Sequence, residues 1–331
     1  MESLQTIKSR IKGVQNINQI TKAMELVAAT KMRKSQEVAL ASRAYAYTAL
    51  DFLANLSKME GIKMPALLKK RKVAKTAFVV VSSDKGLAGS FNSNVFRHFE
   101  NYLKKENIFI GTESLKRDSV PTENVFIAFG QKAAAYLQRK GANVEKSFVK
   151  IGDFTKLEEA KPLSDFLCNN FIEKKWDKVL VFSQQFRSAL KQDVLMRQVL
   201  PVDAEIIHST IKELVPETGR FSELRGLNDS ASPDPSSVEK GRRLEMTDYL
   251  IEPSPSKVLK ELAPHLVEMQ IYHLILEANA SEHAARRMAM KNASDNAEEL
   301  AGNLTLEYNK SRQAAITREI IEIVAGAEAA K

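Results

Sequence analysis

The stretch of this chain whose residue types best suit chemistry is a glycine-containing loop at residues 83–90, which reads SDKGLAGS. It follows a short apolar run and precedes an amphipathic stretch, the position that phosphate-binding loops occupy in α/β proteins. Its spacing matches neither a Walker loop, G-x-x-x-x-G-K-[ST], nor the dinucleotide pattern G-x-G-x-x-G. We therefore interpret the loop as a tight strand-to-helix turn and predict no cofactor and no cofactor-binding residue.

The other reactive side chains predict no catalytic or metal site. The many carboxylates include no pair that the sequence singles out for acid–base work, so no catalytic residue is predicted. The single cysteine, Cys168, rules out an intramolecular disulfide, fits a reducing compartment and is expected to be a buried, unreactive thiol. No metal ligand is predicted either, because the histidines stand at no recognised ligand spacing: His98, His208, His265, His273 and His283.

The positive charge is concentrated near one end of the chain. The net charge is +8, and residues 1–50 carry eight basic and three acidic side chains, a difference of +5, whereas residues 282–331 carry seven basic and eight acidic ones. A basic surface suits either nucleic acid or an acidic protein partner. Within it, Lys31, Arg33 and Lys34 form either a solvated helix face or a contact surface.

The elements that must position these residues begin with a long helix at 1–60. Residues 3–60 contain no proline and one glycine, and apolar residues recur there at steps of three and four. A helix of that length would span about 80 Å, which favours a coiled-coil or stalk role over a compact domain. The expected apolar seam consists of Leu4, Ile7, Ile11, Val14, Ile17, Ile20, Met24, Val27, Val38, Ala41, Tyr45, Thr48 and Phe52.

A second helix of comparable length is predicted at 255–331. The two seams could bury each other as an antiparallel coiled coil, with residues 20–27 beside the last three turns of the chain. Two separate helices docking on other proteins would show the same pattern. The expected seam is Leu259, Leu262, Leu266, Met269, Leu274, Ala278, Ala285, Met288, Leu300, Leu304, Ile316, Ile320 and Ile323.

The middle of the chain predicts a Rossmann-like α/β domain at 72–205 with a mainly parallel sheet. Short β-branched or apolar runs alternate with helical stretches there, which is typical of βαβ units. The expected strands are 76–82, 125–129, 178–182 and 193–200, and the expected helices are 92–105, 131–140 and 156–175. Residues 206–248, which are rich in proline, glycine and serine, are interpreted as a surface insertion or linker.

Both ends of the chain resemble one known family. Residues 17–34 read INQITKAMELVAATKMRK, residues 281–290 read SEHAARRMAM, and residues 308–324 read YNKSRQAAITREIIEIV. These segments are similar to signature blocks of the gamma subunits of F-type, rotary ATP synthases. The loop at 83–90 resembles the family's S-D-[KR]-G-L-C-G-G, with Ala88 in place of the usual cysteine and Ser90 in place of the second glycine.

Two shorter segments extend the resemblance. Residues 130–132 read GQK and residues 249–253 read YLIEP, and both are similar to the family's pattern. One departure is Arg318, which stands where the family usually has glutamine. Residues 205–245 form a longer stretch than compact bacterial members have, and the absence of cysteine there excludes the redox switch of chloroplast members.

The resemblance implies a central rotor shaft that couples ion transport through the membrane rotor to ATP synthesis or hydrolysis. The implied partners are three alpha and three beta subunits around the shaft, the epsilon subunit, and the membrane c-ring. By resemblance, the contacts with the beta subunits fall on Met24, Arg312, Gln313, Thr317, Glu319 and Glu322. The basic Lys31, Arg33 and Lys34 would face acidic loops of beta.

The resemblance further implies a non-catalytic, peripheral subunit at the cytoplasmic face of a bacterial membrane, with no direct membrane insertion and no nucleic-acid partner. Two other classes remain as alternatives from the residues alone. A nucleic-acid-binding coiled coil would interleave aromatic and basic residues, and a nucleotide-using α/β enzyme would need a phosphate loop. The sequence contains neither feature in recognisable form.

Overall fold

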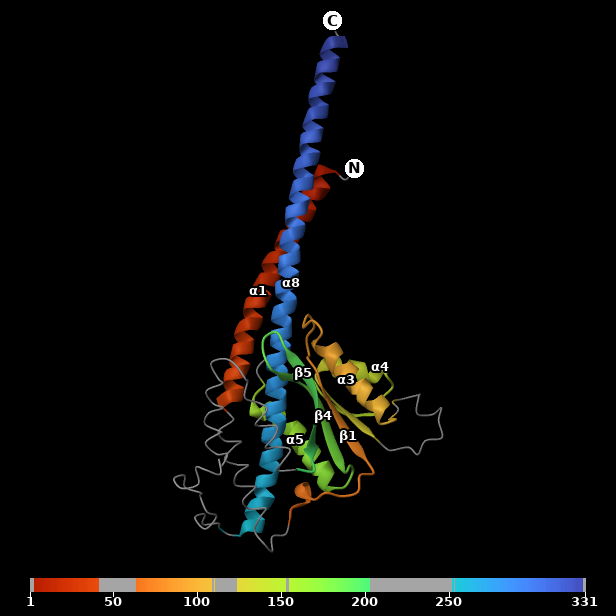
Figure 1. Cartoon of the computed structure of the whole chain (residues 1–331), viewed down its shortest axis with the longest axis vertical. Helices are drawn as coiled ribbons and strands as arrows, with labels where there is room; N and C mark the ends of the chain where they lie inside the picture. The colour runs from red at the N-terminus through yellow and green to blue at the C-terminus, as the bar shows by residue number, and fades with distance from the viewer. Residues whose placement is uncertain are drawn as a thin grey trace, which may run out of the picture. The chain divides into compact units, whose positions relative to one another are not determined.

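The chain forms two compact units (Figure 1). One contains Met1–Thr30 and Arg286–Lys331, and the other contains Lys31–Ala285. The expected helix beyond residue 41 and the expected insertion at 206–248 lie outside the described residues. This computed structural model describes residues 3–41, 64–108, 110, 124–152, 155–202, 252 and 254–329.

The larger unit contains a five-stranded sheet. Neighbouring pairs among the first four strands in the chain are parallel, whereas the last strand runs antiparallel to its neighbour, and the strand order is β3-β2-β1-β4-β5. Short runs of β-branched and aromatic residues form strands because both faces of such a sheet are buried. The strands are β1 (Thr76–Val81), β2 (Val125–Phe129), β3 (Val144–Phe148), β4 (Lys178–Phe186) and β5 (Gln192–Leu200).

Helices cover both faces of this sheet. Helices α3 (Phe91–Lys105) and α4 (Gln131–Arg139) pack on one face, and α5 (Leu157–Ile172) and part of α8 (Pro255–Ala329) pack on the other (Figure 1). A single-turn helix, η1 (Ala66–Leu68), joins the second face. The layered arrangement confirms the predicted α/β fold with a mainly parallel sheet.

Large aromatic side chains fill the core between the sheet and α3. Phe78 of β1 stacks on Phe126 of β2 with ring centroids 5.6 Å apart, and Phe182 of β4 meets Phe99 of α3 edge-on at 5.0 Å. All four rings are buried, and we call them the aromatic cluster. Such contacts stabilise the unit through their buried area and through favourable ring geometry.

The smaller unit is an antiparallel pair formed by parts of α8 and of α1 (Leu4–Ala41). The Ser294 hydroxyl donates a hydrogen bond of 2.5 Å to Asn18 Oδ1, and Arg287 Nε lies 3.9 Å from Glu25 Oε1. Moving seven residues forward in α1 therefore corresponds to moving seven residues backward in α8. The predicted antiparallel coiled coil is confirmed.

The contact stripe of each helix repeats every seven residues. In α1 the stripe comprises two rows of buried or half-buried residues: Ile7, Val14, Thr21 and Ala28, and Leu4, Ile11, Asn18 and Glu25. In α8 the rows are Met290, Ala297, Leu304 and Ser311, and Arg287, Ser294, Ala301 and Tyr308. A strict seven-residue repeat is the pattern of a coiled coil.

The predicted seam of α1 is wrong at Ile17, Ile20 and Val27. Ile17, Ile20 and Val27 are more than half exposed, whereas Thr21 and Ala28 are buried. The prediction followed the largest apolar side chains, but the heptad stripe places small residues at the contact. Thr21 tolerates burial because its hydroxyl donates to the carbonyl oxygens of Ile17 and Asn18 in its own helix.

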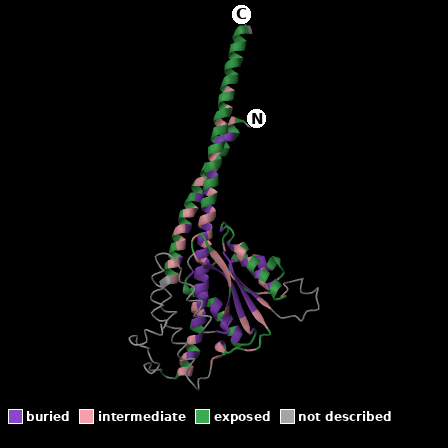
Figure 2. Cartoon of the chain, viewed as in Figure 1, coloured by how far each residue is buried: buried purple, intermediate pink, exposed green. Residues whose placement is uncertain are grey.

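The predicted register and the predicted end of the α8 seam are also wrong. Residue 25 lies opposite residue 287, so residues 20–27 do not lie beside the last three turns of α8. The same register places Leu4, the first residue of α1, near residue 308, and α8 continues to Ala329 without a pairing helix among the residues that the structure describes. The last turns of α8 are exposed (Figure 2), and with them three expected seam residues: Ile316, Ile320 and Ile323. A fourth, Leu300, is exposed within the paired part of the helix.

Candidate functional sites: the strand-end loop and the partner-binding surfaces

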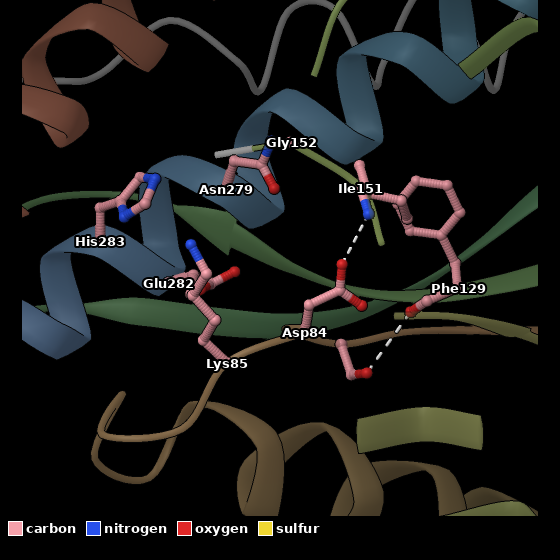
Figure 3. A pocket seen from close by; sticks show the side chains of 9 residues that line it. Asp84, Lys85, Phe129, Ile151, Gly152, Asn279, Glu282 and His283 are labelled. Atoms are coloured by element: carbon pink, nitrogen blue, oxygen red, sulfur yellow. Dashed lines mark hydrogen bonds between the residues drawn. The ribbon is translucent and has the colours of Figure 1, made fainter. Parts of the chain in front are cut away.

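The loop at 83–90 is fastened to its neighbours through Asp84. One carboxylate oxygen accepts a hydrogen bond of 2.7 Å from the backbone nitrogen of Gln131, and the other accepts one of 2.6 Å from that of Ile151 (Figure 3). Asp84 thus joins the segments that follow β1, β2 and β3. Hydrogen bonds to an ionised acceptor are the stronger kind, so this side chain is a structural clasp.

The amino-terminal end of α4 is closed by the same loop. Its first three backbone N–H groups donate to Asp84 Oδ1, to the Ser83 carbonyl at 3.1 Å and to Ser82 Oγ at 2.7 Å. A helix amino terminus binds phosphate through these very donors. Because the chain itself occupies them, these three donors of α4 are not open to a phosphate, and Asp84 acts as part of the helix cap.

Gly130 permits this close approach. Its φ is +98°, and a Cβ atom there would stand 2.2 Å from the Ser82 carbonyl oxygen. Close packing against Ser82 therefore explains why the GQK segment begins with glycine. Glycine is required because any side chain would push the β1 and β2 loops apart.

A small cleft, partly open to solvent, lies beside the clasp. Asn279, Glu282 and His283 of α8 line it opposite Asp84 and Lys85 (Figure 3). Asn279 donates a hydrogen bond of 2.8 Å to Thr155 Oγ1, which ties α8 to the segment before α5. Among the described residues no group of histidine, cysteine, aspartate and glutamate side chains could hold a metal ion.

The predicted partner-binding residues of α1 fall in both units. Met24 is half-buried within the smaller unit, beside the contact stripe. In the larger unit Lys31 is half-buried, and Arg33 and Lys34 are exposed. The structure thus leaves the two basic side chains accessible on the surface of α1.

The predicted residues of α8 are all exposed. Thr317 Oγ1 donates a hydrogen bond of 2.9 Å to the Gln313 carbonyl oxygen, so the spacing of four does place these two residues on one face. Arg312 and Glu319 share another face, two turns apart. Glu322 continues the polar surface toward the end of the helix.

Sequence reasoning missed a set of exposed apolar residues next to these polar ones. They lie along the last turns of α8 and along the outward side of α1, and all are at least 48% exposed: Ile316, Ile320, Ile321, Ile323 and Val324, and Ile17, Ile20, Leu26 and Val27. Counting strict heptads from Ile7 would have separated the exposed apolar residues of α1 from its contact stripe. Exposed apolar rows of this kind are typical of interaction surfaces.

Together these features define a class of protein: a two-helix shaft joined to a doubly wound α/β unit whose strand-end loops are closed by their own side chains. No helix within the described ranges is long and apolar enough to cross a bilayer. The exposed apolar and polar rows of its helices offer surfaces for contact with other proteins.

Comparison with known proteins identifies the family. The family model described as ATP synthase matches residues 3–330. The ATP synthase gamma chain of Roseiflexus sp. (strain RS-1) is 37% identical, with 99% of each chain covered, and that of Geotalea uraniireducens is 34% identical over the whole of both chains. The chain therefore belongs to the ATP synthase gamma-chain family.

Solved structures show the same fold at greater distance. A chain of the mitochondrial ATP synthase of Euglena gracilis is similar with a TM-score of 0.59 and 17% identity, covering 98% of this chain and 94% of that one. A chain from the central stalk and c-ring of the Tetrahymena thermophila enzyme has a TM-score of 0.53 and 21% identity, covering 83% and 99%.

Proposed function

We propose that the chain is the central rotor shaft of an F-type ATP synthase, coupling ion flow through the membrane rotor to ATP synthesis or hydrolysis by rotation inside the alpha/beta ring. Gamma chains that match over their full length support this assignment. The fold supports it as well, because a helical pair joined to an α/β unit is similar to the solved central stalks.

One observation carries the proposal: the last turns of α8 run past the start of α1 and expose large apolar side chains. Ile320 and Ile323 are 55% and 71% exposed. Burying apolar surface contributes roughly 25 cal/mol per Å², so a row of such residues favours a protein environment over water. The alpha and beta subunits, three of each, are the partners that would surround this segment.

The polar residues beside this row would contact the catalytic beta subunits. Arg312 can offer a planar pair of donors to a carboxylate, and Gln313 can both donate and accept. Thr317, Glu319 and Glu322 extend the same exposed surface. On α1 we assign the same role to Met24, Lys31, Arg33 and Lys34, the basic residues facing acidic loops.

The chain itself would be non-catalytic. The closed amino terminus of α4 supports this proposal, because its first three backbone N–H groups bind residues 82–84 of the chain itself and so do not face a nucleotide phosphate. Catalysis would then reside in the beta subunits, and this chain would need no cofactor.

The remaining assignments follow from the family. The epsilon subunit and the membrane c-ring would bind the α/β unit and the adjoining helices, and the protein would be peripheral, at the cytoplasmic face of a bacterial membrane. We assign the shaft helices to residues 1–60 and 255–331, the α/β domain to 72–205, and a surface insertion to 206–248. Nucleic acid and direct membrane insertion have no part in this function.

Assembly with separately purified alpha and beta subunits tests the proposal. Ile320→Ser with Ile323→Ser should weaken retention of the chain in the complex at least tenfold, because two large apolar contacts are lost. A matched control is Thr305→Ser with Asn309→Ser, on exposed α8 residues without large apolar side chains. A wild-type chain that never co-assembles, while retaining nucleic acid or turning over ATP by itself, would overturn the assignment.

A further inference from the structure

The contact stripe of the helical pair is unusually poor in large apolar residues around its centre. Thr21 and Ala28 of α1 are buried there, and Ser294 and Ala297 of α8 lie on the facing stripe. Large side chains resist sliding because each fills a defined hole between residues of the partner helix. Small side chains interlock less deeply, so packing alone opposes sliding weakly at this level.

Two polar contacts stand where packing is weakest. The bond from Ser294 Oγ to Asn18 Oδ1 measures 2.5 Å, and the ion pair between Arg287 and Glu25 stands one heptad away on both helices. Both Asn18 and Ser294 belong to the contact stripe, and Ser294 is only 5% exposed. A directional bond in such a place opposes sliding because its partners do not recur along the stripe.

Displacement by one heptad would separate both pairs. In one direction Asn18 would meet Ala301 and Glu25 would meet Ser294, and Arg287 would lose its carboxylate. In the other direction Asn18 would meet Arg287, and Ser294 would face Ile11. A single polar pair inside a coiled coil can specify register in this way, at some cost in stability.

We propose that the Asn18–Ser294 hydrogen bond, assisted by the Glu25–Arg287 pair, is a register lock that keeps α1 and α8 from sliding past each other under load. The inference rests on the shaft function proposed above. Since one heptad corresponds to about 10 Å along a helix, sliding would displace Met24 of α1 relative to Arg312 of α8. Asn18 and Ser294 are thus positioning residues for the partner-binding surfaces.

The test compares two pairs of substitutions in the full chain assembled with alpha and beta subunits. Asn18→Leu with Ser294→Ala removes the lock and makes the interface more apolar, whereas Asn18→Ser with Ser294→Asn exchanges the partners and retains a bond. Register is read by disulfide formation. Ile11→Cys with Ala301→Cys reports the native register, and Ile11→Cys with Tyr308→Cys reports a displacement of one heptad.

During ATP turnover the displaced cross-link should rise about fivefold in the Leu/Ala variant, the equilibrium equivalent of one neutral hydrogen bond. It should return to the wild-type level in the exchanged variant. Thermal unfolding of the Leu/Ala variant should occur at an unchanged or higher temperature. A displaced cross-link that stays at the wild-type level in the Leu/Ala variant, or that rises equally in the exchanged variant, would overturn the lock.

Failure of the shaft function itself is distinguishable in this design. It would appear as absent co-assembly of the wild-type chain, before any cross-link is measured. A fall in unfolding temperature without displaced cross-links would reduce the Asn18–Ser294 bond to an ordinary stabilising contact and refute the proposal.

Discussion

The two units differ in how much of their large apolar surface they bury. In the sheet unit the largest apolar side chains, including the aromatic cluster of Phe78, Phe99, Phe126 and Phe182, are buried. In the helical pair the centre of the buried stripe contains threonine, alanine and serine, although Ile7 and Leu304 are buried nearer its end, and several isoleucine and valine residues are exposed. One unit is therefore built to stabilise itself, and the other to be completed by partners.

This difference separates stability from function within one chain. Truncating a side chain in the sheet core should unfold the chain and affect assembly only through that loss. Truncating an outward residue of α8 should leave the isolated chain intact and affect only the complex. The expected effects decrease from the packed strand ends, through the aromatic cluster, to the exposed surface.

The largest effect is expected at Gly130. Gly130→Val should prevent stable folding of the α/β unit, because its Cβ would stand 2.2 Å from the Ser82 carbonyl oxygen and φ is +98°. Thermal unfolding followed by circular dichroism measures the stability of the variant. The control is Gly86→Ala in the neighbouring loop, where an added Cβ meets no atom within 4 Å. Equal stability of the two variants would contradict the close-packed strand ends.

Phe182→Ala should destabilise the chain by about 3–5 kcal/mol, because it leaves a cavity in the aromatic cluster. Ile323→Ala, at a residue that is 71% exposed, should change the free energy of unfolding of the isolated chain by less than about 0.5 kcal/mol. Chemical denaturation of both variants measures the two changes in the free energy of unfolding. A large loss for Ile323→Ala would mean that α8 ends against another part of this chain.

Arg312→Ala with Gln313→Ala should slow ATP turnover of the assembled complex about tenfold while leaving the chain folded. Both side chains are exposed, and a hydrogen bond to a charged partner group is worth about 1.5–3 kcal/mol. Turnover is measured after subunit stoichiometry has been checked. Asn303→Ala, on the exposed surface of the paired part of α8, serves as the control. Wild-type rates in a fully assembled double variant would make both residues ordinary solvated surface.

How much the sequence predicts also differs between the two units. Residues of β1, β2, β4 and β5 were predicted because β-branched and aromatic runs are clear signals in a doubly buried sheet. The strand β3, VEKSF, was missed, since a sheet edge with Glu145 and Lys146 exposed lacks an apolar run. The antiparallel pairing was predicted correctly, but its register was not.

The register was predicted wrongly because several of the largest apolar side chains of α1 are not the buried ones. Ile17 and Ile20 are larger and more apolar than Thr21, yet Thr21 is the buried residue. A search that ranks positions by hydrophobicity therefore selects the exposed isoleucines of α1 instead of the residues that contact α8. The predicted polar contact residues of α8 came from the family resemblance, and their exposure agrees with that role without testing it. The exposure of the neighbouring isoleucines, by contrast, was visible only in the structure.

The smallest predicted effect concerns an ion pair on the surface of the sheet unit, where Glu100 of α3 meets α4. The Glu100 carboxylate lies 2.8 Å from Lys140 Nζ and accepts a hydrogen bond of 2.7 Å from the Tyr136 hydroxyl. The hydrogen bond from Lys140, followed by that from Tyr136, holds the pKa of Glu100 below its ordinary value of 4.5. A lowered pKa in the folded state means that the ionised carboxylate stabilises the fold.

That stabilisation is fully present above about pH 4.5 and is lost as the pH falls through the lower, folded-state pKa. Glu100→Gln should therefore reduce the free energy of unfolding by about 0.5 kcal/mol at pH 7, since the pair is partly solvated. The difference from the wild type should shrink as the pH is lowered below 4.5. Glu173→Gln, which removes an exposed ion pair with Lys175 at 3.2 Å, is the control and should have a smaller effect. A difference in stability between Glu100→Gln and the wild type that stays constant from pH 7 to pH 3 would show that the charge of the Glu100 carboxylate does not stabilise the fold.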